Sequence, residues 1–214
     1  MEINWLGHSC FRLKGKDVTL ITDPYDKSVG YSLGRPQADI VTVSHEHFDH
    51  GNATAISGNP KIIKGPGEYE IKNVFIKGIS TFHDMEEGKA RGRNTVYAIT
   101  IDEVVICHLG DLGHVLTQAQ AEELDEIDVL LVPVGGTYTI DATQAAEVVS
   151  LLEPKIVIPM HFQTEVLTLG KRLDPVEKFL KEMGQPAVNP QPKLLVTRGA
   201  LPEETQIVVL DYHR

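Results

Sequence analysis

The residues best suited to chemistry lie together in the segment Ser44-His45-Glu46-His47-Phe48-Asp49-His50-Gly51. Three imidazoles and a carboxylate this close together are hard to explain as packing, because each buried polar group needs its own partner. Imidazole and carboxylate ligands together suit zinc, iron or manganese. In a loop after a strand, His45 and His47 can point one way and Asp49 and His50 another, which suits two ions better than one. We call residues 44–51 the metal loop and predict that it binds metal; the alternative is a polar loop.

Several of the nine histidines follow strand-like sequence. His108 comes after the β-branched run Val104-Val105-Ile106, as His45 and His161 come after similar runs. Side chains at strand ends can converge on one site from distant parts of the chain, as they do in α/β enzymes. The histidine positions therefore predict a single site at one edge of a sheet.

The pattern of these residues resembles the metallo-β-lactamase superfamily, whose hallmark is H-x-H-x-D-H after a strand. The metal loop matches that hallmark. The other parts of the family pattern occur in the family's order along most of the chain. The early aspartate that supports the metal loop matches Asp23, and the third histidine for the first metal matches His83. The bridging aspartate matches Asp111, and the last histidine matches His161.

The resemblance implies a binuclear site with a defined ligand set. It assigns His45, His47 and His83 to the first metal. It assigns Asp49, His50 and His161 to the second metal, and Asp111 to both. Asp49 and Asp111 then hold and orient the attacking water. His108 competes with His83 as a ligand and otherwise reads as a residue supporting the ligands or as the proton donor to the leaving group.

Segments outside the ligand set indicate which branch of the superfamily the chain resembles. Residues 5–11, 133–141 and 158–161 look like the branch that includes L-ascorbate-6-phosphate lactonase and N-acyl-phosphatidylethanolamine phospholipase D. Those relatives carry a comparable Gly-His pair near the N-terminus. His8 either faces the site, supporting the ligands, or is a hydrogen-bonded core histidine.

Basic residues after His83 suggest how a substrate is bound. Arg91 and Arg93 lie in a short basic segment, and arginine can hold an anionic group in bidentate fashion. We therefore expect a phosphate- or carboxylate-bearing substrate, with a solvated basic loop as the alternative. His114 is a further candidate for contacting the substrate or protonating the leaving group.

The elements that must position these residues are short strands followed by alternating helices and strands. Apolar runs and Gly or Pro turns predict strands, and capping patterns predict helices. The fold class expected is a four-layer αββα sandwich over residues 1–214, with two mixed sheets and helices on the outer faces. The predicted strands are 3–6, 10–13, 18–21, 40–43, 61–64, 74–79, 95–101, 104–107, 129–133, 155–159, 194–197 and 206–210, with helices at 117–124, 141–152 and 176–183.

Composition excludes several classes of protein. A net charge of −10 makes nucleic acid a poor partner, since phosphate-backbone binding needs a basic face. No apolar stretch approaches the roughly 20 residues of a membrane span, and no secretory signal is recognised, so a cytoplasmic location is expected. Cys10 and Cys107 are too few for a disulfide framework and read as buried thiols. Oligomeric state is left open, including a homo-oligomer.

The function expected is hydrolysis by a hydroxide bridging two divalent ions, zinc being favoured over manganese or iron. A small anionic ester, lactone or phosphodiester is the substrate class, and nothing in the residues decides among these bonds. Two alternatives stay open: a non-catalytic metal-binding or sensory protein, and a diiron redox protein of the same fold. His47 stands where diiron relatives usually carry glutamate, which favours hydrolysis.

Overall fold

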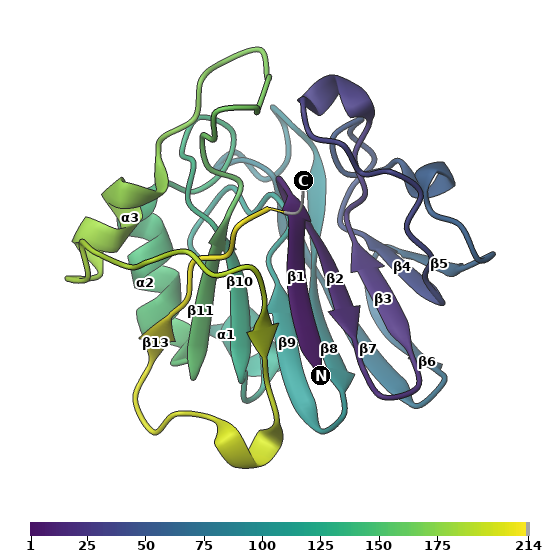
Figure 1. Cartoon of the computed structure of the whole chain (residues 1–214). Coiled ribbons are helices and arrows are strands. Elements are labelled where there is room, and N and C mark those ends of the chain that lie inside the picture. The colour runs from purple at the N-terminus through teal and green to yellow at the C-terminus, as the bar shows by residue number, and fades with distance from the viewer. Residues whose placement is uncertain (213–214) are drawn as a thin grey trace.

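In the computed structural model, which describes residues 1–212, the strands form two sheets that pack face to face (Figure 1). The first sheet has the order β12-β1-β2-β3-β4-β5. Its strands β12, β1, β2 and β3 pair antiparallel, whereas β3, β4 and β5 pair parallel. Their bounds are β1 Glu2–Gly7, β2 Cys10–Lys14, β3 Thr19–Thr22, β4 Ile40–Val43, β5 Lys61–Lys64 and β12 Leu194–Leu195.

The second sheet has the order β13-β11-β10-β9-β8-β7-β6. It is antiparallel from β6 to β9 and parallel from β9 to β13. Both sheets are therefore mixed, as expected. The bounds are β6 Gly67–Ile71, β7 Val74–Phe82, β8 Arg93–Ile101, β9 Val104–His108, β10 Val129–Pro133, β11 Ile156–Met160 and β13 Gln206–Ile207.

The main core lies between the two sheets. Trp5 and Phe11 of the first sheet belong to the same apolar cluster as Val96 and Ile99 of the second, and all four are almost fully buried. Strands with one face on such a core should alternate apolar and polar residues, whereas β4 and β10 are buried along their whole length and are apolar nearly throughout. Cys10 and Cys107 are both buried free thiols, as predicted.

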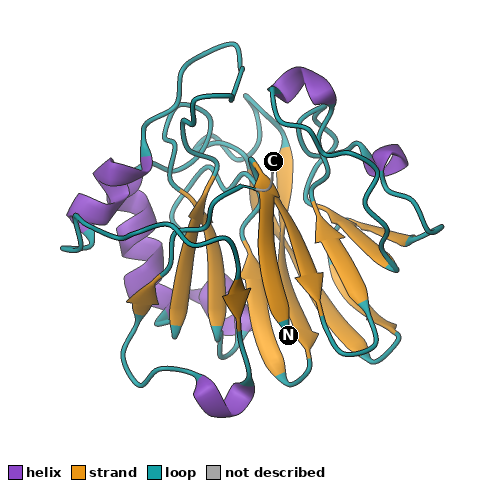
Figure 2. Ribbon diagram, in the orientation of Figure 1, coloured by secondary structure: helices purple, strands orange, loops and turns teal. Residues whose placement is uncertain are grey.

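The α-helices lie on the side of the second sheet, where the first two contact its strands and the third packs against the second helix (Figure 2). They are α1 (Gln118–Leu124), α2 (Ala142–Leu152) and α3 (Val176–Glu182). Capping boxes start α1 and α2, where Thr117 and Asp141 each accept from the backbone three residues on. The outer face of the first sheet is covered near the site by loops and the short 3-10 helix Lys27–Val29, whose Tyr25, Val29 and Leu167 form a second apolar cluster with Val41. The sandwich of two mixed sheets expected from the sequence is confirmed, but within residues 1–212 the α-helices cover the second sheet alone and not both outer faces as predicted.

Two differences from the predicted elements concern edge strands. Residues 67–71 are not among the predicted strands but form β6, an edge strand in which exposed Glu68 and Glu70 alternate with half-buried Tyr69 and Ile71. The closing strands β12 and β13, each at the edge of its sheet, are two residues long and so shorter than predicted. In the part of the chain described, no helix is long and apolar enough to cross a membrane.

Candidate metal centre

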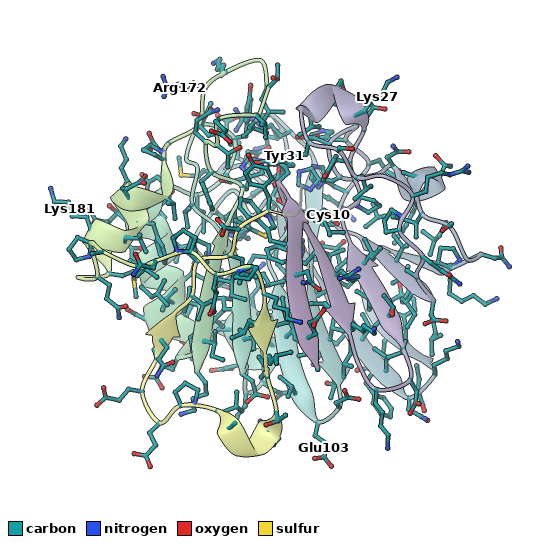
Figure 3. The ribbon with its side chains drawn as sticks, viewed as in Figure 1. Cys10, Lys27, Tyr31, Glu103, Arg172 and Lys181 are labelled. Carbon is teal, nitrogen blue, oxygen red and sulfur yellow. The ribbon has the colours of Figure 1, made fainter. Side chains whose placement is uncertain are left out.

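The ligand candidates converge at one edge of the two sheets. The metal loop follows β4, His83 follows β7, Asp111 lies three residues after β9, His161 directly follows β11, and His8 directly follows β1. The ends of β1 and β11 both point toward the upper edge in Figure 1. Figure 3 shows Tyr31 and Cys10 toward this same edge, whereas Glu103, in the turn between β8 and β9, marks the opposite one.

Asp111 lies between two groups of imidazoles. Its Oδ2 atom is 3.2 Å from His83 Nε2 and 3.9 Å from His45 Nε2. Its Oδ1 atom is 3.2 Å from His50 Nε2 and 3.4 Å from His161 Nε2. One carboxylate oxygen therefore faces each group, which is the arrangement that a bridging ligand requires.

The first group consists of His45, His47 and His83, which we call the first set. His45 Nε2 and His47 Nδ1 are 3.1 Å apart, and the His83 ring centroid is 4.8 Å from that of His45. One ligand atom from each of the three can be chosen so that all lie within 4.8 Å of one another. His45 and His83 are buried, whereas His47 is exposed to solvent.

The second group consists of Asp49, His50 and His161, which we call the second set. Asp49 Oδ2 is 3.7 Å from His50 Nε2, and the His50 and His161 rings lie 5.9 Å apart. These three residues are almost completely buried. The structure therefore brings together all seven side chains that the resemblance assigned as ligands, and it adds His8 beside the second set.

The residues present fit bound metal. Within residues 1–212, His50 Nε2, both ring nitrogens of His161 and Asp111 Oδ1 are buried without a hydrogen-bond partner. Leaving such atoms unsatisfied is costly, and native proteins rarely do so without a reason. The unpartnered atoms are of the imidazole and carboxylate types that bind zinc, iron and manganese, and they face one another.

Asp23 organises the metal loop from beneath. Its carboxylate accepts from the Ser44 backbone N–H at 2.7 Å and from the Ser44 hydroxyl, and lies 2.8 Å from His50 Nδ1. The Ser44 hydroxyl is in turn 3.0 Å from His45 Nδ1. Carboxylates commonly hold metal-binding histidines through the nitrogen that faces away from the metal. Asp23 thus leaves the Nε2 atoms of His45 and His50 to face the cluster.

Burial and mutual contact shift the protonation of the cluster. Burial acts to lower the pKa of His50, but Asp111, Asp23 and Asp49 outweigh it and raise that pKa well above its usual value. Burial, followed by the neighbouring His50, lowers the pKa of His45 to about 3. Burial acts to raise the pKa of Asp111, but the neighbouring His161 and His50 outweigh it and hold that pKa well below its usual value.

Close backbone packing fixes the positions of His8 and His161. Both residues have left-handed backbones, with φ of 55° and 52°. The His8 carbonyl accepts from Trp5 Nε1 at 2.8 Å and from the His161 N–H at 3.2 Å. Gly135 packs so tightly on this region that a Cβ atom there would lie 2.1 Å from the His161 carbonyl oxygen. Non-glycine residues held at positive φ are frequently found at functional sites.

The structure does not bring His108 or His114 into the cluster. His108 Nδ1 accepts from the Gly110 N–H, which leaves Nε2 to donate to the Ser9 carbonyl at 2.8 Å. His114 Nε2 accepts from the Phe82 N–H at 3.3 Å, and its Nδ1 donates to the carbonyl of Val115. Both rings are held by backbone groups at both nitrogens, so His83, not His108, stands at the first set.

The two arginines differ in their surroundings. Arg91 donates to the carbonyls of Tyr138 at 3.1 Å and Thr137 at 3.2 Å, and its guanidinium lies over the Tyr138 ring. It therefore ties the loop after His83 to the loop at residues 137–138. Arg93 starts β8 opposite Phe82 and is exposed.

Sequence reasoning did not identify the role of Asp84, directly after His83. Its buried carboxylate accepts from four backbone N–H groups, those of Glu86, Gly88, Ala90 and Arg91. Burial acts to raise its pKa, but these hydrogen bonds together lower it to about 2. An aspartate that opens a glycine-containing loop is a known turn signal, and it was the available clue.

Comparison with known proteins places the chain in a family. The model of the beta-lactamase superfamily domain matches residues 2–161. A UPF0173 metal-dependent hydrolase of Pyrococcus horikoshii is 32% identical over 195 residues, covering 77% of this chain and 85% of its own. A crystal structure from Thermotoga maritima, assigned to the metallo-β-lactamase superfamily as a Zn-dependent hydrolase, is 42% identical with a TM-score of 0.80, covering 98% of this chain and 97% of its own.

A more distant likeness concerns the fold alone. An isothiocyanate hydrolase from Delia radicum gut bacteria has a TM-score of 0.67 at 13% identity, covering 100% of this chain and 98% of its own. The activity named for the closer relatives agrees with the metal-dependent hydrolase expected from the sequence. The chain belongs to the metallo-β-lactamase superfamily.

Proposed function

We propose that the chain is a binuclear metal-dependent hydrolase of a small anionic ester, lactone or phosphodiester. The observation that carries the proposal is the position of Asp111, whose two carboxylate oxygens face different groups of buried imidazoles. A site for one ion would not need a carboxylate divided in this way. The unpartnered nitrogens of His50 and His161 support the same conclusion.

The first set, the second set and Asp111 would hold the two ions, with zinc favoured over manganese or iron. Two such ions supply Lewis-acid chemistry and a hydroxide at neutral pH. Asp111, charged because its pKa is held low, orients the two sets relative to each other. Asp49 lies beside His50 with Oδ2 turned toward the cluster and helps to position the attacking water.

The substrate assignment rests on Arg93 and on the resemblance to the lactonase and phospholipase branch. Arg93 is exposed and begins β8, while β7, its partner, ends next to His83. Its guanidinium is suited to an anionic group of a substrate whose scissile bond lies at the cluster. Arg91 uses part of its donor set on two carbonyls and serves first to hold the loop. We do not assign the leaving-group proton to His108 or His114, since backbone groups occupy both nitrogens of each.

Metal analysis combined with a substrate panel tests this function. The purified chain is assayed for bound metal and for hydrolysis of lactone, thioester and phosphodiester substrates, before and after chelation. We expect about two ions per chain and an activity that chelation removes and metal restores. Failure to bind metal after reconstitution, or an activity unaffected by chelation, would contradict the proposal.

A further inference from the structure

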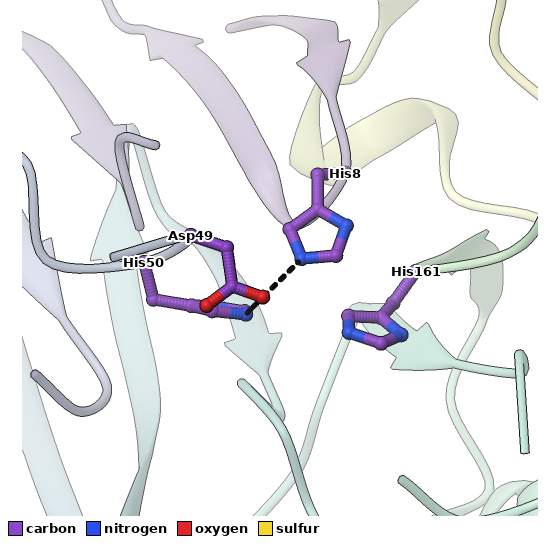
Figure 4. A group of neighbouring side chains, drawn as sticks. All are labelled: His8, Asp49, His50 and His161. Carbon is purple, nitrogen blue, oxygen red and sulfur yellow. Dashed lines mark hydrogen bonds and ion pairs between the residues drawn. The ribbon is translucent and has the colours of Figure 1, made fainter. Parts of the chain in front are cut away.

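We propose that His8 is a direct ligand of the second ion, joining Asp49, His50 and His161. The inference rests on the binuclear site proposed above and assigns one more side chain to it. The metal loop and its partners would already account for a second set of three residues. His8 comes from a different strand end, and its ring lies over the set with Asp49 and His50 on one side and His161 on the other (Figure 4).

The position of the His8 ring is that of a ligand. Its Nε2 atom is 3.2 Å from Asp49 Oδ2, and its ring centroid is 4.2 Å from that of His161 and 4.9 Å from that of His50. Ligand atoms of all four residues lie within 4.8 Å of one another. Neighbouring ligand atoms that are each about 2.0–2.1 Å from a zinc ion, at angles of about 90–120° at the metal, lie about 2.9–3.6 Å apart. The separation of His8 Nε2 and Asp49 Oδ2 matches that spacing.

If His8 were only a hydrogen-bond donor to Asp49, the position of its ring would be explained less well. A charge-assisted N–H···O bond to a carboxylate is normally about 2.7–2.9 Å long, shorter than the separation here. Such a donor needs to face Asp49 alone, whereas the His8 ring also lies against His50 and His161. Within the described chain, His8 Nδ1 is buried without a partner, as are nitrogens of His83 and His161 in the two sets.

The backbone around His8 is built to aim this ring. Gly7 has φ of 108°, and a Cβ atom there would lie 2.6 Å from the Tyr31 ring, so only glycine allows β1 to end in this way. His8 follows with a left-handed backbone, and its carbonyl is held by Trp5 and His161. The side chain is 0% exposed. Strain of this kind persists where the surrounding structure determines the position of a functional group.

The assignment makes the two metal sites unequal. The second ion would be held by four buried side chains besides Asp111. The first ion would have one protein ligand fewer, three imidazoles besides Asp111, and one of these, His47, is exposed to solvent. Substrate and water would therefore reach the first ion more readily than the second.

Counting the coordinated histidines tests the assignment directly. Metal-free protein is loaded with Co²⁺, and the solvent-exchangeable, paramagnetically shifted ring N–H signals are counted by proton NMR. A background variant with His45, His47 and His83 all replaced by Asn keeps only the second set. We expect three histidine signals in that background, two after adding His8→Asn, and three after adding His108→Asn, a control at an equally buried histidine outside the cluster. Asn is chosen because it tolerates a left-handed backbone.

Two outcomes would overturn the assignment: two signals in the background variant, or a count that His8→Asn leaves unchanged. The unsubstituted chain loaded with two equivalents gives the same answer if a variant fails to fold, since His8 makes the difference between six coordinated histidines and five. If the unsubstituted chain binds two ions and hydrolyses substrate but shows five histidines, only the His8 assignment fails. If it binds no ion, both the proposed function and this assignment fail.

Discussion

Asp23 lies 2.8 Å from His50 Nδ1 and, through the same carboxylate, accepts from the backbone N–H of Ser44. One side chain thus links the end of β3 to both the start of the metal loop and its last histidine. The pair also decides which nitrogen of His50 faces Asp111, because Nδ1 is occupied and Nε2 is free. Substituting a residue that holds a metal ligand in this way commonly lowers metal affinity or activity about 10–100-fold.

Asp23→Asn should weaken metal binding without removing a ligand. The amide no longer accepts as a charged group from His50 Nδ1, so we expect metal affinity to fall about 10–100-fold. Competition with a chromophoric chelator measures the change. Asp39→Asn is the control, since Asp39 also accepts a backbone N–H and pairs with Lys72 but lies outside the cluster. Equal effects of the two substitutions would contradict the role given to Asp23.

Asp111→Asn should reduce both metal content and turnover. Removing the charge shared by the two sets leaves the imidazoles of His83 and His161 without their common carboxylate. We expect fewer than two ions per chain after dialysis and a fall in kcat of about 10²–10³-fold or more. Metal analysis and steady-state kinetics on the same sample give both values. Full activity in this variant, or in Asp49→Ala, would be incompatible with the binuclear mechanism.

Arg93→Ala should weaken binding of anionic substrates selectively. Hydrogen bonds to charged groups contribute about 1.5–3 kcal/mol, so KM should rise about 10–100-fold for an anionic substrate and little for a neutral one. Arg91→Ala should in addition lower thermal stability, because it removes two hydrogen bonds to the loop at residues 137–138. Kinetics on a charged and an uncharged ester of the same leaving group separate these effects. If KM for every active anionic substrate were unchanged in both variants, neither arginine would contact the substrate.

Asp84→Asn should destabilise the metal-free protein in a pH-dependent manner. The folded pKa of Asp84 is about 2, below the value near 3.9 of an unfolded chain, so the unfolded state binds more protons between these values. The stabilisation by Asp84 is therefore fully present above about pH 4 and is lost as the pH falls toward 2. Urea unfolding of both proteins from pH 7 to pH 3 should show a difference that shrinks at the acid end. Glu87→Gln, at an exposed carboxylate of the same loop, provides the control, and a difference independent of pH would exclude the carboxylate as its source.

Gly135→Ala should displace His161. The added Cβ atom would meet the His161 carbonyl oxygen at 2.1 Å, so the backbone that carries the imidazole must shift. We expect a loss of about 1–3 kcal/mol in the free energy of unfolding, as for other overpacked sites, together with weaker metal binding. Gly199→Ala is a matched control, since a Cβ atom there meets nothing within 4 Å. Its effect should stay within about 0.5 kcal/mol, as at other surface positions. Unaltered metal binding in Gly135→Ala would show that His161 tolerates the shift.

Patterns of neighbouring residues in the sequence determined much of the fold and the metal loop of the site. The metal loop carries four of its ligand candidates within a few residues, so their chemistry and spacing were visible without any tertiary contact. Helices α1 and α2 were equally local, because a capping box is a pattern of neighbouring residues. His83 and Asp111 are far from the loop in sequence, and only the family pattern connected them to it, whereas the position of His161 after a strand-like run was a second, independent indication.

Tertiary structure decided which of the remaining candidates meet. His8 Nε2 reaches Asp49 across 41 residues, and His108 Nε2 is occupied by the Ser9 carbonyl 99 residues away. The Gly-His pair suggested that His8 could face the site, but nothing in the local sequence excluded His108, which also follows an apolar run. Arg91 likewise was expected to face a substrate and instead donates to carbonyls 46 and 47 residues further along the chain. The residue types and strand ends are properties of the sequence, whereas the partner of each polar atom depends on how the sheets pack.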